Sequence, residues 1–356
     1  MSNSSYTLTV TVVQAGRTIK SILLSDVLMS RRLVRQLAHT GQVLRNGEAV
    51  YLTQRTVEGD EISVMLPTEE SNVLPETMPL EPLYEDSEII VVNKSPGILT
   101  HPTARERNGS LLAGVRAGLP QGMIPHCVHR LDRDTSGLVM FAKHSHAHQL
   151  FDRSLRNSGL HRVYVAISQT LSGFHYKENV WHTIDLPIAQ DPEHPSKRII
   201  SLGGQRALTH FRIVRLAQDA TLSQVVLETG RTHQIRLHMA TIGLPLVGDK
   251  DYGHEASRGV RDADQHQRNH ATLWGHLQPS EDPSERPESD LFQPTRQMLH
   301  AMHLGWVHPV SQKFQLASVI PPLDMRHLWQ YRGGDDQIWI ELLKDSSAWL
   351  PIEMLL

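Results

Sequence analysis

The sequence predicts a mixed α+β fold with a mostly antiparallel central sheet, preceded by a small N-terminal α/β unit. The β-prone segments mostly follow one another with few regular β-α-β alternations, which favours a mixed sheet over a doubly wound parallel one. The chain has 356 residues, 39% hydrophobic and 21% charged, enough for one large and one small domain. An acidic, Pro-rich stretch separates the two.

Residues 1–66 have the pattern of a small α/β unit. Two strands and one helix are expected, at Tyr6–Val13, Glu61–Leu66 and Ser30–His39. Asn46-Gly47, between β-prone segments, indicates a hairpin because both residues tolerate positive φ. Residues 67–82, rich in Pro, Glu, Ser and Thr, are expected to form an acidic linker.

Residues 83–332 are expected to form the large domain. Its strands are predicted at 88–94, 137–143, 164–168, 207–216, 224–229 and 300–308, and its helices at 147–157 and 232–242. Residues 254–294, dominated by polar residues and proline, are expected to be a mobile insertion. Residues 333–356 form a C-terminal tail whose apolar runs are expected to pack on the domain or on a partner.

The charges are unevenly distributed, although the formal net charge is only -3. Residues 27–47 carry four arginines and no acidic residue, and residues 58–88 carry ten acidic residues without Lys or Arg. Residues 126–164 are basic again. Two basic blocks around an acidic connector are what two RNA-contacting modules would need, and solvated faces would give the same pattern.

Several other classes of protein are disfavoured. The first residues lack the basic start and apolar core of a signal peptide, and no apolar run approaches the roughly 20 residues that span a bilayer. We therefore expect a cytoplasmic protein without membrane contact. The one cysteine, Cys127, leaves no internal disulfide, and a spectator thiol is favoured over a nucleophile.

No metal and no cofactor are expected. His144, His146 and His148 resemble a row of metal ligands, but no carboxylate or second histidine pair stands at ligand spacing. Neither Gly-rich phosphate motif occurs, so nucleotide cofactors have no support.

The most informative segment is His129–Gly137, with the sequence HRLDRDTSG. A short polar loop ahead of an apolar strand can hold a carboxylate at the edge of a sheet, and Gly137 permits a tight turn. A second segment, TGRTHQIRLH, begins at Thr229. There Gly230 can bend the chain and Thr232 can cap a helix that carries two cationic side chains.

These two segments resemble the motifs of the RluA family of pseudouridine synthases, H-R-L-D-x-x-T-S-G and G-R-T-H-Q-I-R. Further matches between Leu83 and Asp324 are Asn93-Lys94, Pro96-Gly97, Tyr164, Ala207 with Thr209, Gly248-Asp249, Tyr252-Gly253, Arg296-Gln297 and Leu299-His300-Ala301. Residues 1–66 are similar to the small RNA-binding domain that this family shares with a ribosomal small-subunit protein.

The resemblance implies an isomerase that converts uridine in RNA to pseudouridine after flipping the base out of its stack. Asp132 matches the catalytic carboxylate, which either attacks the nucleoside or removes a sugar proton; Asp134, alone or as a pair with Asp132, is the alternative. Arg236 matches its ion-pair partner, with Arg231 as the alternative. Tyr164 matches the aromatic that stacks on uracil, although plain packing would also account for a strand tyrosine.

RNA contacts are expected from both basic blocks. The candidate residues are His129, Arg130, Arg133, Arg231 and His233 in the large domain, and Arg31, Arg32, Arg35 and Arg45 in the N-terminal unit. Arg130 is expected to fill the gap left by the flipped base, by stacking or by phosphate contact. The sequence departs from the family at Arg162 and Gln205, where lysine is more common.

The expected substrate is large-subunit ribosomal RNA, because the small domain is similar to that of rRNA-modifying relatives. Transfer RNA is the alternative substrate, and a non-catalytic RNA-binding or ribosome-assembly factor is the rival function. A glycoside hydrolase would need two carboxylates and an aromatic-rich surface, which 5% aromatic residues do not suggest. The protein is expected to act as a monomer.

Overall fold

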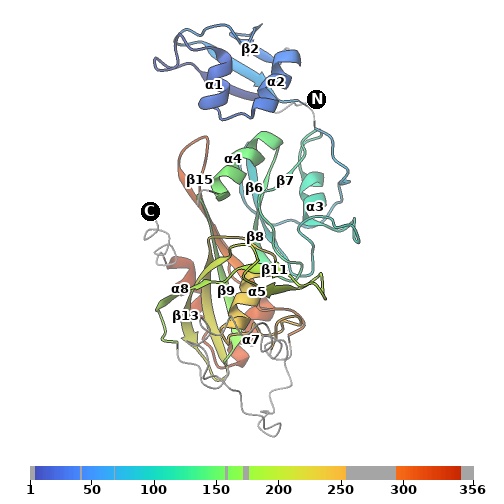
Figure 1. The fold of residues 1–356 in the computed structure, drawn as a ribbon, viewed down its shortest axis with the longest axis vertical. Helices are drawn as coiled ribbons and strands as arrows, with labels where there is room; N and C mark the ends of the chain where they lie inside the picture. The colour runs from blue at the N-terminus through green and yellow to red at the C-terminus, as the bar shows by residue number, and fades with distance from the viewer. Residues whose placement is uncertain are drawn as a thin grey trace.

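The computed structural model describes residues 5–40, 42–67, 69–156, 159–170, 176–253 and 294–345. These residues form a four-stranded sheet near the N-terminus, a ten-stranded sheet, and a two-stranded ribbon (Figure 1). The predicted mobile insertion lies outside the described residues except for Pro294, as does the tail beyond Asp345. No helix in these ranges is long and apolar enough to cross a membrane.

The N-terminal unit, residues 5–66, contains four strands in the antiparallel order β1-β4-β2-β3 and two helices. They are β1 (Ser5–Thr9), α1 (Ile19–Ser25), α2 (Arg31–Thr40), β2 (Val43–Arg45), β3 (Glu48–Ala49) and β4 (Glu61–Met65). The hairpin expected at Asn46-Gly47 is confirmed, with φ values of 52° and 85°. No sequence pattern indicated α1, which is only seven residues long and begins after the N-cap residue Thr18.

The large sheet has the strand order β10-β13-β14-β9-β15-β8-β6-β5, with β16 paired to β15 and β7 to β8. Its strands are β5 (Pro82–Glu85), β6 (Ile89–Lys94), β7 (His126–Cys127), β8 (Ser136–Ala142), β9 (Leu160–Gln169), β10 (Trp181–Asp185), β13 (Leu208–Leu216), β14 (Ala220–Leu227), β15 (Leu299–Val307) and β16 (Phe314–Ser318). Only the β15–β8 pairing is parallel. The predicted mixed, mostly antiparallel fold class is therefore confirmed.

Five helices and a short ribbon complete the described part of the large domain and its tail. They are α3 (Leu111–Gly118), α4 (Ser145–Arg156), α5 (Gln234–Thr241), α7 (Leu323–Tyr331), α8 (Ile338–Lys344) and the ribbon strands β11 (Ile188–Gln190) and β12 (Arg198–Ile200). Helices α4 and α5 match the predicted helices within a few residues.

Both faces of β9 are buried, and this explains its nearly continuous apolar sequence. Tyr164 and Ala166 belong to the core on one face, whereas Val165 and Ile167 belong to the core on the other. Alternate residues of a strand point to opposite faces, so a strand covered on both sides needs apolar residues throughout. The second core includes α7 and α8, and Trp339 from α8 is buried in it. The described part of the tail thus packs on the main sheet.

Residues 69–76 of the connecting segment contact the large domain. The Glu69 carboxylate accepts a hydrogen bond from the backbone N–H of Ser145 at 2.8 Å and lies 2.7 Å from His126 Nε2. The N-terminal unit also contacts α4 directly, because Gln149 Nε2 donates to the Leu28 carbonyl at 3.0 Å. Two contacts therefore meet near the start of α4, the helix beneath the N-terminal unit (Figure 1).

Candidate active site

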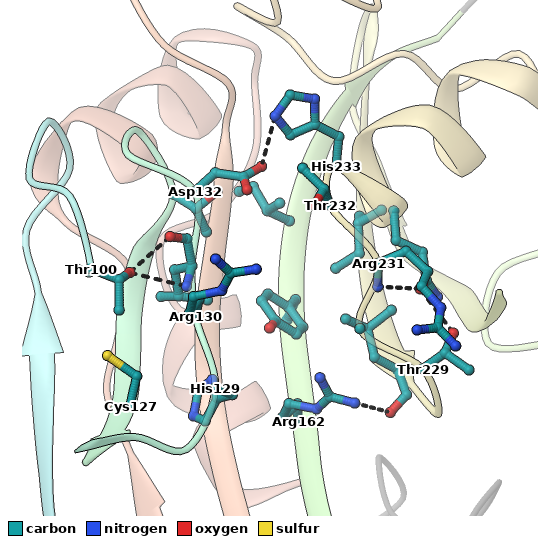
Figure 2. A pocket seen from close by; sticks show the side chains of 18 of the residues that line it. Thr100, Cys127, His129, Arg130, Asp132, Arg162, Thr229, Arg231, Thr232 and His233 are labelled. Atoms are coloured by element: carbon teal, nitrogen blue, oxygen red, sulfur yellow. Dashed lines mark hydrogen bonds and ion pairs between the residues drawn. The ribbon is translucent and has the colours of Figure 1, made fainter. Parts of the chain in front are cut away.

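A cleft of about 770 Å³ opens between the loop 128–135, strand β9 and the turn from β14 into α5. Figure 2 shows that its walls come from segments about 100 residues apart in the chain. The lining includes eight residues predicted from sequence, namely His129, Arg130, Asp132, Arg133, Tyr164, Arg231, His233 and Arg236. The long-range fold thus brings both sequence motifs to one site.

The loop that carries Asp132 is held from two directions. The Thr100 hydroxyl donates to the Leu131 carbonyl at 2.8 Å and lies 3.1 Å from the Leu131 N–H (Figure 2). Lys94 Nζ donates to the Arg133 carbonyl at 2.7 Å. Backbone groups are therefore fixed directly before and after Asp132, which restricts the positions that its carboxylate can reach.

Lys94 is fully buried without a carboxylate within ion-pair distance among the described residues. Its ammonium group donates to three backbone carbonyls, of Ser95, Ile98 and Arg133. Burial lowers the pKa of Lys94 to about 7, and the nearby Asp134 and Asp132 charges act in the opposite direction. This side chain ties the end of β6 to the Asp132 loop.

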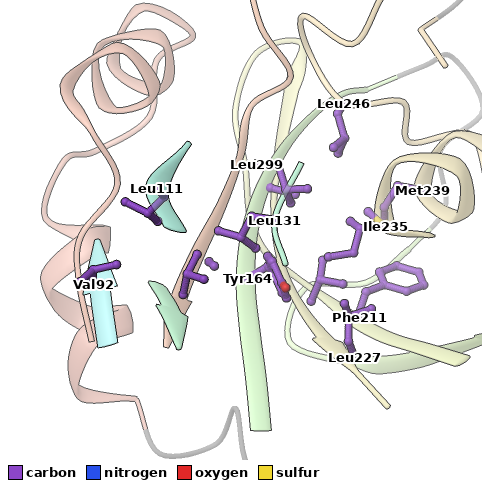
Figure 3. Close-up of a cluster of buried hydrophobic side chains, with 14 of the residues drawn as sticks. Val92, Leu111, Leu131, Tyr164, Phe211, Leu227, Ile235, Met239, Leu246 and Leu299 are labelled. Atoms are coloured by element: carbon purple, nitrogen blue, oxygen red, sulfur yellow. The ribbon is translucent and has the colours of Figure 1, made fainter. Parts of the chain in front are cut away.

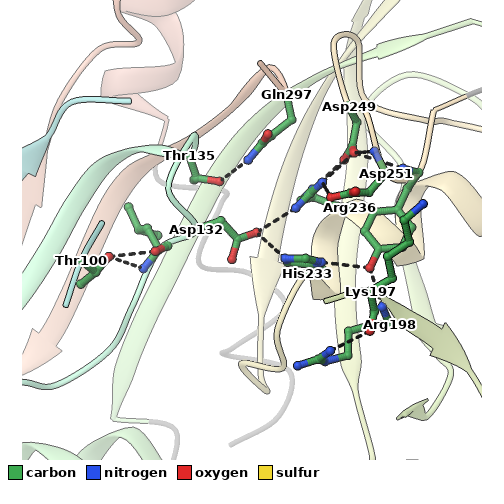
Figure 4. A network of polar contacts seen from close by, with 12 residues as sticks. Thr100, Asp132, Thr135, Lys197, Arg198, His233, Arg236, Asp249, Asp251 and Gln297 are labelled. Atoms are coloured by element: carbon green, nitrogen blue, oxygen red, sulfur yellow. Dashed lines mark hydrogen bonds and ion pairs between the residues drawn. The ribbon is translucent and has the colours of Figure 1, made fainter. Parts of the chain in front are cut away.

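The Asp132 carboxylate faces two basic side chains of the second motif (Figure 4). Its Oδ2 lies 3.5 Å from Arg236 Nη1 and 4.0 Å from His233 Nε2. The described structure contains no ion pair between Asp132 and Arg231, which donates instead to the Arg206 carbonyl. Asp134 does not line the cleft.

Arg236 is oriented by two further carboxylates. Asp249 accepts two hydrogen bonds from the guanidinium, from Nε and Nη2, both at 2.7 Å. Asp251 accepts another from Nη2 at 2.7 Å. These acidic partners raise the pKa of Arg236 above its usual value, against the effect of burial. With Nε and Nη2 occupied, Nη1 is the nitrogen that faces Asp132.

His233 begins helix α5 in a way that differs from the sequence-based expectation. The N-cap is His233 with a left-handed φ of 58°, so the predicted Thr232 cap was wrong. The turn is stabilised instead by the Gln234 side chain, whose Oε1 accepts from the Arg231 N–H at 3.0 Å and the Thr229 hydroxyl at 2.8 Å. A long side chain from the first turn thus replaces the usual cap.

Tyr252 helps to orient the imidazole ring of His233. The Tyr252 hydroxyl accepts a hydrogen bond from the Arg198 N–H at 2.7 Å and lies 2.9 Å from His233 Nδ1. The other ring nitrogen, His233 Nε2, faces Asp132. Burial lowers the pKa of His233, and the Asp132 charge partly opposes that shift.

Tyr164 lies in the wall of the cleft on β9, at the edge of the main hydrophobic core (Figure 3). The residue is 4% exposed, and the same core includes Leu131, Leu227 and Leu299. Burial raises the pKa of Tyr164, so the phenol stays neutral at physiological pH. The core holds this ring rigidly beside the Asp132 loop.

Comparison with known proteins agrees with the two motifs. Residues 88–241 match the sequence family described as RNA pseudouridylate synthase. A Bacillus subtilis protein named uncharacterized RNA pseudouridine synthase YlyB is 40% identical over 234 residues, which is 63% of this chain and 75% of that protein. The chain belongs to the RluA-type family of RNA pseudouridine synthases.

Two further comparisons extend over more of the chain. A ribosomal large subunit pseudouridine synthase D of Neisseria meningitidis is 31% identical over 333 residues, covering 90% of this chain and 80% of that protein. The solved structure of human RNA pseudouridylate synthase domain containing 1 aligns with 75% of this chain and 99% of its own, with a TM-score of 0.47 and 20% identity. The family match and the sequence relatives identify the chain as an RNA-modifying enzyme, an isomerase that forms pseudouridine.

The remaining predicted RNA contacts of this pseudouridine synthase differ in their availability. Arg130 lines the cleft beside His101, whereas the Arg133 guanidinium is paired with Glu106. In the N-terminal unit the three arginines of α2 are exposed, namely Arg31, Arg32 and Arg35. Arg45 is half-buried, with its Nε 2.7 Å from Asp60.

Sequence reasoning assigned no role to several residues that build this pseudouridine synthase site. Lys94 and Asp249 were recognised only as motif matches, and Thr100 and Asp251 were not recognised at all. The groups that these residues contact lie far away in the sequence, or are brought close only by the path of a loop. The one available signal was the position of Lys94 and Asp249 within segments that resemble motifs of the family.

Proposed function

We propose that this RNA pseudouridine synthase modifies large-subunit ribosomal RNA and that Asp132 is its catalytic carboxylate. The reaction breaks the bond from uracil nitrogen 1 to the ribose, turns the freed base, and joins carbon 5 of the ring to the sugar. It needs no redox change and no external reactant. A carboxylate beside the ribose can serve either by attacking the nucleoside or by removing a sugar proton.

The observation that carries this assignment is the position of Asp132, which belongs to the first motif and faces two side chains of the second. Its Oδ2 faces Arg236 Nη1 at 3.5 Å, and the carboxylate remains partly open to the cleft. Glu228 is the other carboxylate among the described lining residues, and it is paired with His210 at 2.9 Å. A glycosidase-like reaction with two free carboxylates therefore has less support than a reaction with one.

Arg236 is proposed to hold the Asp132 carboxylate in its working position. A guanidinium fixed by Asp249 and Asp251 is a preorganised partner, because it needs no rearrangement when charge develops at Asp132. Tyr164 is proposed to stack on the flipped uracil, since its ring lines the cleft on a rigid strand. Arg130 and the other arginines at the cleft are proposed to hold the RNA around the flipped base.

The N-terminal unit is proposed to be a second RNA-binding domain. We propose boundaries of 1–66 for it, 67–82 for the connecting segment and 83–332 for the catalytic domain. The exposed arginines of α2 are the proposed RNA contacts, and a second binding module raises the effective concentration of RNA at the cleft. Ribosomal RNA is preferred because several relatives are named ribosomal large subunit pseudouridine synthase D. Transfer RNA is the alternative.

A pseudouridine map of total rRNA and tRNA tests these proposals together. The map is compared between cells lacking the protein and the same cells restored with the wild type or with Asp132→Asn. We expect one or a few sites in large-subunit rRNA to disappear and to return only with the wild type. Sites found only in tRNA would replace the substrate proposal. Full restoration by Asp132→Asn would reject the catalytic assignment.

A further inference from the structure

Arg162 is a buried cation in the wall of the cleft. It lies on β9 two residues before Tyr164, so both side chains point to the same face of the strand, about 6.6 Å apart along the chain. The residue is only 6% exposed. Figure 2 shows Arg162 and Asp132 at opposite ends of the cleft in that view.

The guanidinium of Arg162 has weak partners. Its Nη2 donates to the carbonyls of Leu227 and Glu228 at 3.4 and 3.5 Å, which is the limit of a hydrogen bond. Its Nε has no hydrogen-bond partner among the described residues, and no described carboxylate lies within ion-pair distance. A buried cation without a counter-ion is costly to a fold, so such a group is expected to be completed by a ligand.

The space beside Arg162 depends on a glycine of the second motif. A Cβ atom at Gly230 would lie 2.6 Å from Arg162 Nη1, although Gly230 itself has an ordinary negative φ. The absence of a side chain here therefore leaves room for Nη1 at the cleft wall rather than allowing an unusual backbone turn.

The surroundings favour an anion over a neutral group. Arg130, Arg156 and Arg231 also line the cleft, and Glu228, an acidic residue of the same lining, is paired with His210. His129 adds an unpaired donor, because its Nε2 accepts from the Met140 N–H at 3.2 Å while its Nδ1 has no partner. Burial and the Arg162 charge lower the pKa of His129 to about 3, so its ring is neutral and carries its proton on Nδ1.

We propose that Arg162 is a phosphate-binding residue, whose guanidinium holds one phosphodiester group of the RNA substrate at the end of the cleft opposite Asp132. The bound phosphate supplies the negative charge that the described residues around Arg162 do not. Arg162 would thus fix the RNA backbone while the target uridine reaches Asp132, acting as a positioning residue and not in the bond-breaking step. This inference rests on the proposed RNA substrate and names one contact within it.

The test is a coupling measurement between Arg162 and single phosphates. The full chain carries Asp132→Asn to prevent turnover, and its RNA ligand is an oligonucleotide that contains the mapped uridine. Each phosphate near that uridine is replaced in turn by an uncharged methylphosphonate. Dissociation constants are measured for the parent protein and for Arg162→Met.

One phosphate position is expected to respond specifically. Its replacement should weaken binding by the parent protein about tenfold or more, but binding by Arg162→Met less than twofold. The slope of log affinity against log salt should fall by about 0.7 in Arg162→Met. Arg162→Lys should keep that slope, and Lys344→Gln, which removes an exposed cation on α8 outside the cleft, should behave like the parent protein.

Gly230→Ala provides a second test if Arg162→Met fails to fold, because its new methyl group would displace Arg162 Nη1. It should weaken the same phosphate contact. If no phosphate position distinguishes the parent protein from either variant, the inference is wrong. Turnover of the same oligonucleotide by the wild type is measured in parallel, so loss of the phosphate contact and failure of the proposed function give different results.

Discussion

Replacement of Asp249 by alanine should damage both the stability and the activity of this pseudouridine synthase. The Asp249 side chain is fully buried, and it accepts two hydrogen bonds from Arg236 and two more from the backbone N–H groups of Asp251 and Tyr252. Asp249→Ala leaves the buried guanidinium with one partly exposed carboxylate, Asp251, and with Asp132 at 3.5 Å.

The expected loss of unfolding free energy is about 3 kcal/mol. Breaking a buried ion pair by removing one partner costs about 3–5 kcal/mol, and the remaining bond to Asp251 offsets part of that cost. Such a loss is large compared with a total stability of about 5–15 kcal/mol. The rate of pseudouridine formation should fall about 100-fold, because Arg236 is no longer fixed against Asp132.

Urea unfolding and single-turnover assays on the mapped RNA measure the two effects. Asp251→Ala is the matched control, since its carboxylate is 38% exposed and makes one bond to Arg236. We expect that control to lose less than about 1 kcal/mol and to keep most of its rate. If the two variants lose similar stability and similar rate, the reasoning that Asp249 fixes Arg236 is refuted.

Tyr164→Phe should retain most of the single-turnover rate, because no described residue forms a hydrogen bond with the Tyr164 hydroxyl. Tyr164→Ala should lower that rate at least tenfold, because it removes the aromatic ring. Equal losses of rate in the two variants would contradict a stacking role. Gly137→Ala should leave little folded protein in a circular dichroism melt. A Cβ atom at this position would lie 2.2 Å from the Ala301 carbonyl oxygen, and the φ of 109° disfavours any residue other than glycine. A melting curve like that of the wild type would refute this prediction. Burial lowers the pKa of His146 to about 4, so stability present above pH 6.5 should be lost as the pH falls toward 4, by up to about 3 kcal/mol. Urea unfolding at several pH values should show that His146→Leu loses less stability at acidic pH than the wild type. The same dependence of stability on pH in both proteins would contradict this prediction.

The local sequence was sufficient for features that depend on neighbouring residues. The apolar runs of β6, β8 and β15 were located within a residue or two, because a strand buried on both faces needs such a run wherever it lies. The Asn46-Gly47 hairpin was located because its positive φ values are intrinsic to these residue types. Short elements such as α1 and the β11–β12 ribbon were not predicted, because they are too short to show a regular spacing of apolar residues.

The candidate site was only partly readable from the sequence. The two motifs identified Asp132 and Arg236, which are 104 positions apart, but no pattern indicated that Asp249 would fix the guanidinium or that Lys94 would hold the loop. The left-handed backbone conformation of His233 was not predicted either. The sequence suggested an N-cap at Thr232, but hydrogen bonds of the Gln234 side chain stabilise this turn instead.

The sequence by itself determined which chemical groups this chain carries. They are the Asp132 carboxylate on a loop and, later in the chain, the basic side chains of His233 and Arg236 at the start of a helix. The tertiary structure decided which side chains meet, since strand pairing places β9 between β14 and β15 and so brings Tyr164 and Arg162 into the cleft that Asp132 and Arg236 also line. It also decided which charges remain available, because Arg133 and Arg45 have acidic partners whereas Arg162 has none within the part of the chain that the structure describes. Ion pairing depends on distances between segments far apart in the chain, and these distances exist only after the sheet has formed.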